Sequence, residues 1–167
     1  PDVRTERYAA AWDFYDRHAQ NPDFVYAVDE HYYMKPEWFF EHTDFYDSYP
    51  RSRKVFSGEY AAHPQGQHEE GKANILQGAL AEAAFLTGVE RNADVVLLSS
   101  YAPLFARHRF SQWQPDLIWF DEEIAYGTPS YYVQKLYSTN QGSAVLDLQG
   151  QEKELAAQGI YVNAVLD

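Results

Sequence analysis

The sequence predicts an α/β fold built on parallel strands, and three observations lead to this prediction. Segments with helical spacing alternate with short apolar runs typical of strands, in the order helix, strand, helix, strand, helix, strand. The run Val95–Leu98 is apolar throughout, as expected for a strand covered by helices on both faces. Each apolar run is followed by polar and aromatic residues, as at the rim of a parallel barrel.

Four segments have the apolar spacing or the end signals of helices. They are Thr5 to His18, Pro36 to Tyr49, Asn74 to Val89, and Thr128 to Leu136. In the third, Asn74 and Gln77 resemble a capping box. The apolar face expected for that helix consists of Leu76, Leu80, Ala83, Ala84 and Val89.

Three short apolar runs are predicted to be the strands of one parallel sheet. They are Phe24 to Val28, Lys54 to Ser57 and Val95 to Leu98. The residues that follow each run are expected at the carboxyl end of its strand, namely Asp29 to Tyr33, Gly58 to Ala62, and Ser99 to Tyr101. Past Gly142 two further strands are expected, at 143–148 and 160–166, so a domain boundary is predicted near 138–142.

The composition is that of a soluble globular protein. Of 167 residues, 46% are hydrophobic and 23% charged, and the mean hydropathy is -0.55. A net charge of -12 without a Lys/Arg run argues against a nucleic-acid partner. With no cysteine there is no disulfide or thiolate chemistry, and no apolar stretch reaches the ~20 residues of a membrane span.

Aromatic residues make up 17% of the chain, and this fraction has two interpretations. Flat rings match the apolar faces of sugars, so the composition fits a carbohydrate site. The same residues also fit an aromatic core or a subunit interface.

Glu59 is the candidate nucleophile, because parallel α/β barrels place catalytic carboxylates where strands end. Gly58 before it leaves space where a ligand or a backbone could approach. The alternatives are a surface Glu59, solvated acids at Asp29 and Glu30, and a structural His31. The residues His63, His68, Glu69 and Glu70 lack the spacing of a zinc site, so no metal is expected.

Five ordered motifs resemble the α-L-arabinofuranosidases of glycoside hydrolase family 51, over essentially the whole chain. The motifs are VDEHYY at 28–33, VFSGEYA at 55–61, AEAAFLTGVERN at 81–92, SYAPLF at 100–105 and YGTPSYYVQKL at 126–136. The resemblance implies a retaining mechanism without a cofactor. It matches Glu59 to the nucleophile and His31 and Tyr33 to positions beside it, with Tyr101 and Trp113 as candidate walls of sugar subsites.

The acid/base residue of the family lies in an Asn-Glu motif, and this sequence contains no Asn-Glu dipeptide. Judged from strand ends alone, Glu30 would be the catalytic partner of Glu59. The resemblance matches Glu30 to a different position of the family, so we do not assign it the acid/base role. A full (β/α)8 barrel takes roughly 250 residues. We therefore expect residues 1–140 to be the C-terminal half of a barrel and residues 141–167 the start of a β-sandwich domain.

The expected protein is a fragment whose intact enzyme removes terminal arabinofuranosyl groups from arabinan or arabinoxylan, in the periplasm or secreted. The isolated chain should be inactive, and it should self-associate or pair with a missing N-terminal half-barrel. One alternative is a non-catalytic carbohydrate-binding or interaction module. Another is a metal-dependent hydrolase that uses His31, His63 and His68.

Overall fold

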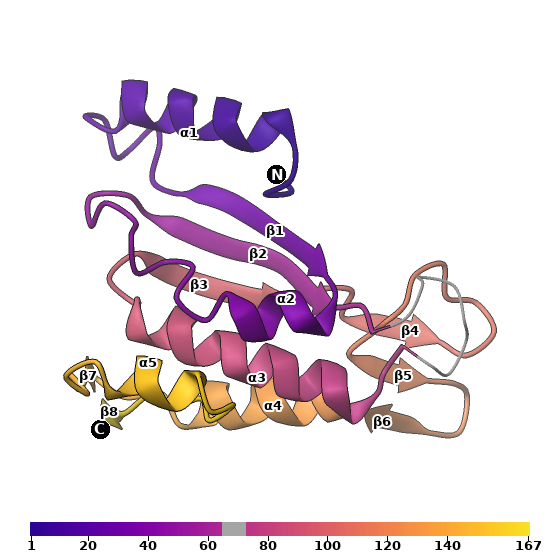
Figure 1. The fold of residues 1–167 in the computed structure, drawn as a ribbon. Coiled ribbons are helices and arrows are strands. Elements are labelled where there is room, and N and C mark those ends of the chain that lie inside the picture. The colour runs from indigo at the N-terminus through magenta and orange to yellow at the C-terminus, as the bar shows by residue number, and fades with distance from the viewer. Residues whose placement is uncertain (65–72) are drawn as a thin grey trace.

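A computed structural model describes residues 1–64 and 73–167. Its centre is a three-stranded parallel sheet in the order β1-β2-β3, formed by Val28–Met34, Val55–Ala62 and Val96–Tyr101. The helices that precede these strands are α1 (Glu6–His18), α2 (Pro36–Glu41) and α3 (Leu76–Arg91). Figure 1 shows α1 beside β1, and α2 and α3 packed together in front of the sheet. The predicted α/β class with parallel strands is confirmed.

The first and last predicted helices form nearly as expected. Helix α1 buries Trp12 and Tyr15 against the sheet side of the molecule. Helix α4 (Pro129–Thr139) begins at Thr128, whose side-chain oxygen accepts a hydrogen bond from the backbone N–H of Tyr131. This is an ordinary N-cap followed by a proline in the first turn, and both signals are visible in the sequence.

The predicted capping box of α3 is wrong, and its predicted apolar face is confirmed only for Ala84 and Val89, which are buried. Asn74 instead uses its side chain to contact the Asp116 backbone and the Trp119 indole. Leu76 and Leu80 are more than half exposed, because α3 turns its small residues inward. The residues it buries are Gly78, Ala79, Ala81, Glu82, Ala84, Phe85, Leu86, Thr87, Gly88 and Val89.

Helix α2 ends at Glu41, whereas the sequence predicts a helix that continues to Tyr49. The segment 42–48 forms consecutive turns that pack against α3. Arg91 fixes this segment by donating to the Thr43 carbonyl oxygen and to Asp47, each at 2.9 Å. Tertiary contacts with α3 therefore replace the continued helix.

The strands β1 and β2 extend beyond the predicted apolar runs. Strand β1 begins at Val28, where the predicted strand ends, and Glu59 lies inside β2 and not after it. Because side chains alternate between the faces of a strand, neighbours in 28–34 face opposite sides. Glu30 and Tyr32 are buried on the helix side, whereas Asp29 and His31 are more exposed on the other side.

Short elements fill the remainder of the chain. Strands β4 (Phe105–Arg107), β5 (Ile118–Phe120) and β6 (Ala125–Gly127) make a second small sheet that the sequence does not predict. The predicted strands at 143–148 and 160–166 are reduced to the antiparallel pair β7 (Ala144–Val145) and β8 (Val165–Leu166). An unpredicted helix, α5 (Gln151–Ala156), lies between them in sequence.

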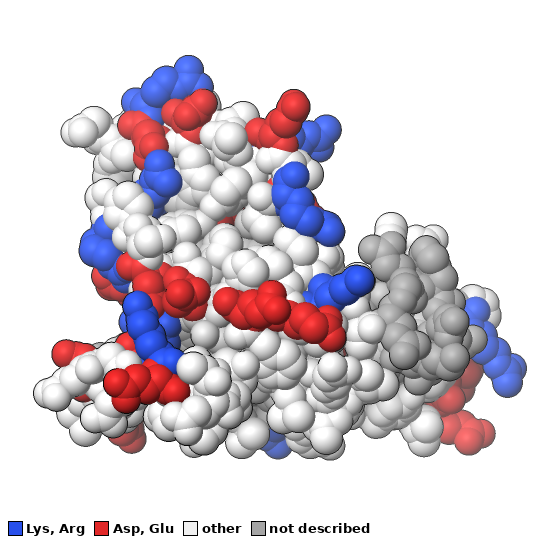
Figure 2. All heavy atoms as spheres, viewed as in Figure 1, with Lys and Arg blue, Asp and Glu red and all other residues white. Residues whose placement is uncertain are grey.

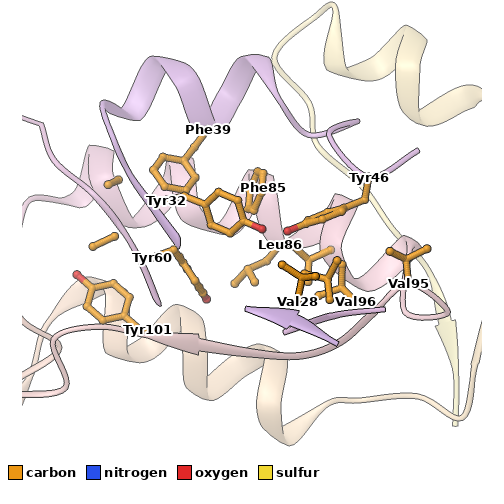
Figure 3. Packing of buried hydrophobic residues seen from close by; sticks show 14 of the residues in the cluster. Val28, Tyr32, Phe39, Tyr46, Tyr60, Phe85, Leu86, Val95, Val96 and Tyr101 are labelled. Carbon is orange, nitrogen blue, oxygen red and sulfur yellow. The ribbon is translucent and has the colours of Figure 1, made fainter. Parts of the chain in front are cut away.

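The core is largely aromatic where α2 and α3 meet the sheet. Figure 3 shows the rings of Tyr32, Phe39 and Phe85 gathered together, with the Tyr46 ring close by. Pairs such as Phe39 and Phe85 pack edge to face with centroids 5.3 Å apart. Much of the aromatic content therefore serves the core, as the second interpretation of the composition anticipated.

Acidic and basic side chains are interspersed on the face shown in Figure 2, where acidic groups also form a row across the middle. Within the described residues, no helix has the length and hydropathy that crossing a membrane requires.

Candidate active site on strands β1 and β2

The candidate site is the pairing of Glu59 on β2 with His31 and Tyr33 on β1. His31 is the register partner of Glu59, just after an irregularity between Glu30 and His31. The Tyr33 hydroxyl donates a hydrogen bond to Glu59 Oε2 at 2.8 Å, and His31 Nδ1 lies 3.3 Å from the same oxygen. The Glu59 side chain is 44% exposed, so its carboxylate remains open to a ligand.

A second carboxylate holds the far side of the His31 ring. His31 Nε2 lies 2.7 Å from Asp29 Oδ2. Since a carboxylate can only accept a hydrogen bond, Nε2 carries a proton and donates the hydrogen bond to Asp29. A side chain at Gly58 would overlap with Asp29 Oδ1. The glycine therefore leaves space for the Asp29 carboxylate, and not for a ligand or another backbone segment.

A pocket of about 460 Å³ opens beside Glu59. Trp113, 61% exposed, forms one of its walls, and Arg4 brings a cation to it. The other lining residues are Tyr33, His63, Ala102, Pro103 and Gln114. Polar side chains on one side of the pocket and an aromatic ring on another are suited to binding a sugar ring.

Two lining residues are held in their neutral forms. Burial, together with the hydrogen bond to Glu59, raises the pKa of the Tyr33 phenol well above its usual value, so the phenol remains a donor. Burial also lowers the pKa of His63, whose ring lies 5.4 Å from that of Tyr33. The Tyr33 phenol is therefore not an anion beside Glu59, and the His63 ring is not a cation beside it.

The N-terminal residues lie along the outer edge of β1. The His31 N–H donates to the Pro1 carbonyl oxygen at 3.0 Å, and the Val3 N–H donates to the His31 carbonyl oxygen at 3.2 Å. This pairing brings Arg4 to the pocket, where its side chain forms an ion pair with Asp2. That ion pair lowers the pKa of Asp2.

Glu30 lies on the opposite face from Glu59, in the interior. Its carboxylate accepts hydrogen bonds from the Tyr32, Tyr46 and Tyr49 hydroxyls and from the Trp12 indole N–H. Burial raises the pKa of Glu30, although these donors oppose the shift. Its location makes it an anchor between β1, α1 and the turns after α2, not a partner of Glu59.

Tyr101, another sequence candidate, also lies away from the pocket. Tyr101 is buried, and its ring packs on Tyr60 with centroids 5.9 Å apart, so it does not line the wall. His68, Glu69 and Glu70 lie outside the described residues. Among the residues that are described, no three His, Cys, Asp or Glu side chains are grouped as metal ligands.

Sequence reasoning does not identify Arg4, Gln114 or the contact of Asp29 with His31 as parts of the site. The N-terminal pairing that places Arg4 is too short to give a strand pattern. Gln114 comes from a loop without a recognisable motif. The only available signal for Asp29 is its spacing of two residues from His31, which puts both on one face of a strand.

A larger hollow of about 700 Å³ lies elsewhere, between the end of α3, β3, α4 and the β7–β8 pair. It contains acids such as Glu90 and Asp94, but Arg51 pairs with Asp94 and Asn163 donates to Glu90. These acids are held in structural contacts, so the pocket at Glu59 is the stronger candidate.

Comparison with known proteins supports a glycoside hydrolase. The sequence model of the family described as "Alpha-L-arabinofuranosidase C-terminal domain" matches residues 58–161. A solved structure of an arabinose-bound family 51 α-L-arabinofuranosidase superposes with a TM-score of 0.65 and 34% identity, over 72% of this chain and 21% of that one. The chain therefore belongs to the α-L-arabinofuranosidases of glycoside hydrolase family 51, as its motifs indicate.

Curated relatives come from bacteria, plants and fungi. The chain is 45% identical over 147 residues to an extracellular exo-α-L-arabinofuranosidase of Streptomyces chartreusis, covering 87% of this chain and 16% of that protein. It is 38% identical over 135 residues to α-L-arabinofuranosidase 2 of Arabidopsis thaliana, covering 79% of this chain and 19% of that protein. The chain thus spans less than a quarter of the length of these relatives.

Proposed function

We propose that this chain is part of a retaining α-L-arabinofuranosidase and that Glu59 is its nucleophile. The observation that carries the proposal is the contact of the Tyr33 hydroxyl with the half-exposed Glu59 carboxylate at 2.8 Å, beside a pocket with a tryptophan wall. A strand-borne carboxylate held by donors and open to a sugar-sized space has the properties that a glycosidase nucleophile needs.

The proposed reaction has two steps. The ionised Glu59 attacks the anomeric carbon and forms a glycosyl ester while a second carboxyl group protonates the leaving oxygen. That group then removes a proton from water, and the water releases the sugar and regenerates Glu59. The Tyr33 hydroxyl, which donates to Glu59 Oε2 at 2.8 Å, orients the carboxylate both before attack and after release.

The proposed substrate is a terminal arabinofuranosyl group of arabinan or arabinoxylan. Trp113 offers a flat apolar surface to the sugar ring, and Arg4 and Gln114 offer hydrogen-bond donors to hydroxyl groups. The arabinose in the related structure and the activity named for the relatives agree with this class. We also propose a secreted or periplasmic location, in keeping with the relative named as extracellular.

The second carboxyl group is proposed to come from outside these residues. Among the described residues that line the pocket, Glu59 is the only one with a carboxylate side chain. We propose that residues 1–140 are the C-terminal half of a (β/α)8 barrel and 141–167 the start of a β-sandwich. The parallel order of β1, β2 and β3 and the small share of each relative covered support this division. The isolated chain would then be inactive.

The test is the replacement Glu59→Gln in the full-length protein, assayed on an aryl arabinofuranoside. Loss of the nucleophile should reduce kcat by at least about 10³-fold, because the amide cannot form the ester. The exposed Glu123→Gln is the matched control and should retain the wild-type rate. Equal rates for both variants would remove Glu59 from the reaction.

A carbohydrate-binding module is the second candidate, and the lack of a second carboxylate among the described lining residues favours it. In that case calorimetry should detect an arabinose-containing oligosaccharide binding to the full-length protein, and Trp113→Ala should weaken the binding. The full-length protein should then hydrolyse none of the bound sugar.

A further inference from the structure

Trp113 reaches the pocket from the loop that joins β4 to β5. Its hydrogen bonds to the described residues involve its backbone, and its side chain is largely exposed. The position of this wall therefore depends on how the loop backbone is held. We propose that Asn74 and Ser111 are positioning residues, which hold Trp113 in place as the wall of the pocket. Their effect on the sugar rests on the proposed function, whereas the position of the indole does not.

Ser111 holds the loop at the residue that carries the indole. Its hydroxyl lies 2.5 Å from the Trp113 carbonyl oxygen, and the Trp113 N–H donates back to the same hydroxyl at 3.3 Å. The hydroxyl also lies 3.0 Å from Oδ2 of Asp116. One serine side chain thus contacts both backbone polar groups of Trp113 and connects them to a residue just before β5.

Asp116 is the fixed end of this connection. It is buried, and so is the side chain of Pro115 before it. The next residue, Leu117, donates its N–H to the Pro103 carbonyl oxygen at 3.1 Å, and Pro103 itself lines the pocket. The end of the loop therefore belongs to the interior, while its Trp113 side chain extends into solvent.

Asn74 holds the same end of the loop from a distant part of the chain, just before α3. Its side-chain N–H donates to the Asp116 carbonyl oxygen at 2.8 Å, and its Oδ1 accepts the Trp119 indole N–H at 3.0 Å. The Asp116 N–H also donates to Oδ1, at 3.4 Å. Only one orientation of the amide satisfies these three contacts, because an N–H can only donate and a carbonyl oxygen can only accept.

Two substitutions of nearly unchanged size interrupt these contacts. Asn74→Asp replaces the donor to the Asp116 carbonyl oxygen with an acceptor, so that two acceptors face each other. Ser111→Ala removes the hydroxyl that connects Trp113 to Asp116. Ser111→Thr keeps a hydroxyl at this position and should preserve the connection.

The first test follows the indoles by ¹⁹F NMR of the full-length protein labelled with fluorotryptophan, with Trp113→Phe and Trp119→Phe to assign the two signals. Ser111→Ala should shift or broaden the Trp113 signal and leave the Trp119 signal unchanged. Ser111→Thr should give the wild-type spectrum. Asn74→Asp should move both signals, because the Trp119 indole donates directly to Asn74.

Ser48→Ala and Asn21→Asp make the same chemical changes at exposed positions, so as controls they should move neither signal. An unchanged Trp113 signal in both Ser111→Ala and Asn74→Asp would overturn the proposal. An equal disturbance of both indoles by Ser111→Ala would also overturn it, because the serine would then support the whole region and not the wall.

A double-mutant cycle connects the indole to the sugar. Ser111→Ala and Asn74→Asp should each raise KM for an aryl arabinofuranoside about three- to tenfold with kcat nearly unchanged, because the wall binds ground state and transition state alike. In a Trp113→Ala background neither should raise KM further, since the residue through which they act is absent. Additive losses would contradict the role. If the wild type hydrolyses no arabinofuranoside, the proposed function fails, while the ¹⁹F signals still decide what holds the indole.

Discussion

Glu82 is a buried acid on α3 with only half of its carboxyl group satisfied. One oxygen accepts the backbone N–H of Ala62 at 2.8 Å, and the other oxygen has no partner among the described residues. Burial raises the pKa of Glu82 to about 7, although the hydrogen bond from the Ala62 N–H and the nearby Ser130 side chain oppose the shift. Near neutral pH the folded protein therefore holds a carboxyl group that is close to half protonated.

This shift predicts how stability changes with pH. Because the folded pKa lies above the ordinary value of 4.5, the contribution of Glu82 is fully present below about pH 4.5 and is lost as pH rises through about 7. Glu82→Gln imitates the protonated form and removes this dependence. In urea unfolding, the variant should gain on the order of 3 kcal/mol relative to wild type between pH 4.5 and pH 8.

Glu123→Gln, an exposed substitution of the same kind, is the control for Glu82→Gln and should follow the pH curve of the wild type. If Glu82→Gln has the same pH dependence as the wild type, then Glu82 is ionised in the fold at neutral pH.

At the scale of elements, close packing between α3 and the turns after α2 depends on Gly88. A side chain there would overlap with the Thr43 backbone carbonyl, which cannot move without the turn that Arg91 holds. Gly78, in the same helix, has its nearest neighbours at 3.6 Å, which leaves room for a methyl group. Packing of α3 therefore requires a glycine at residue 88 but not at residue 78.

We expect opposite effects from the two alanine substitutions. Gly88→Ala should lower the free energy of unfolding by about 2–3 kcal/mol, because a backbone segment must shift. Gly78→Ala should leave it unchanged or raise it by up to about 1 kcal/mol, because alanine favours a helix. Chemical denaturation of both variants measures the difference, and similar losses for both would show that α3 simply tolerates no added methyl group.

The elements also show what the sequence can and cannot predict. The parallel α/β class, α1, α4 and the grouping of His31, Tyr33 and Glu59 follow from apolar spacing, caps and motifs. The start of β1 does not, since Phe24 to Val28 and Val28 to Tyr33 are both plausible strands without knowledge of what covers them. Asn74 has the pattern of a cap, but its partners Asp116 and Trp119 lie far along the chain.

At the scale of the whole molecule, the parallel sheet has edges that a complete barrel would cover. Among the described residues, only Pro1 to Val3 bond along the outer side of β1, and no strand pairs with the outer side of β3. Leu98 on β3 is 66% exposed. Open edges and exposed apolar side chains favour association with other chains.

The isolated 167-residue chain should therefore associate in solution. Light scattering at increasing concentration should show a mass above that of one chain, and Leu98→Lys should reduce association more than Leu136→Lys on α4 does. A monodisperse monomer at all concentrations would contradict this expectation.

The alternation of faces along β1 places a further constraint on how this protein can evolve. Glu30 holds β1 to its helical layer, while the next residue, His31, contacts Glu59. Inserting or deleting one residue within 29–33 would exchange these faces, bringing core aromatics into the pocket and polar groups into the core. Length changes in this lineage should therefore be excluded from this strand and concentrated in exposed loops such as the one that contains Glu123.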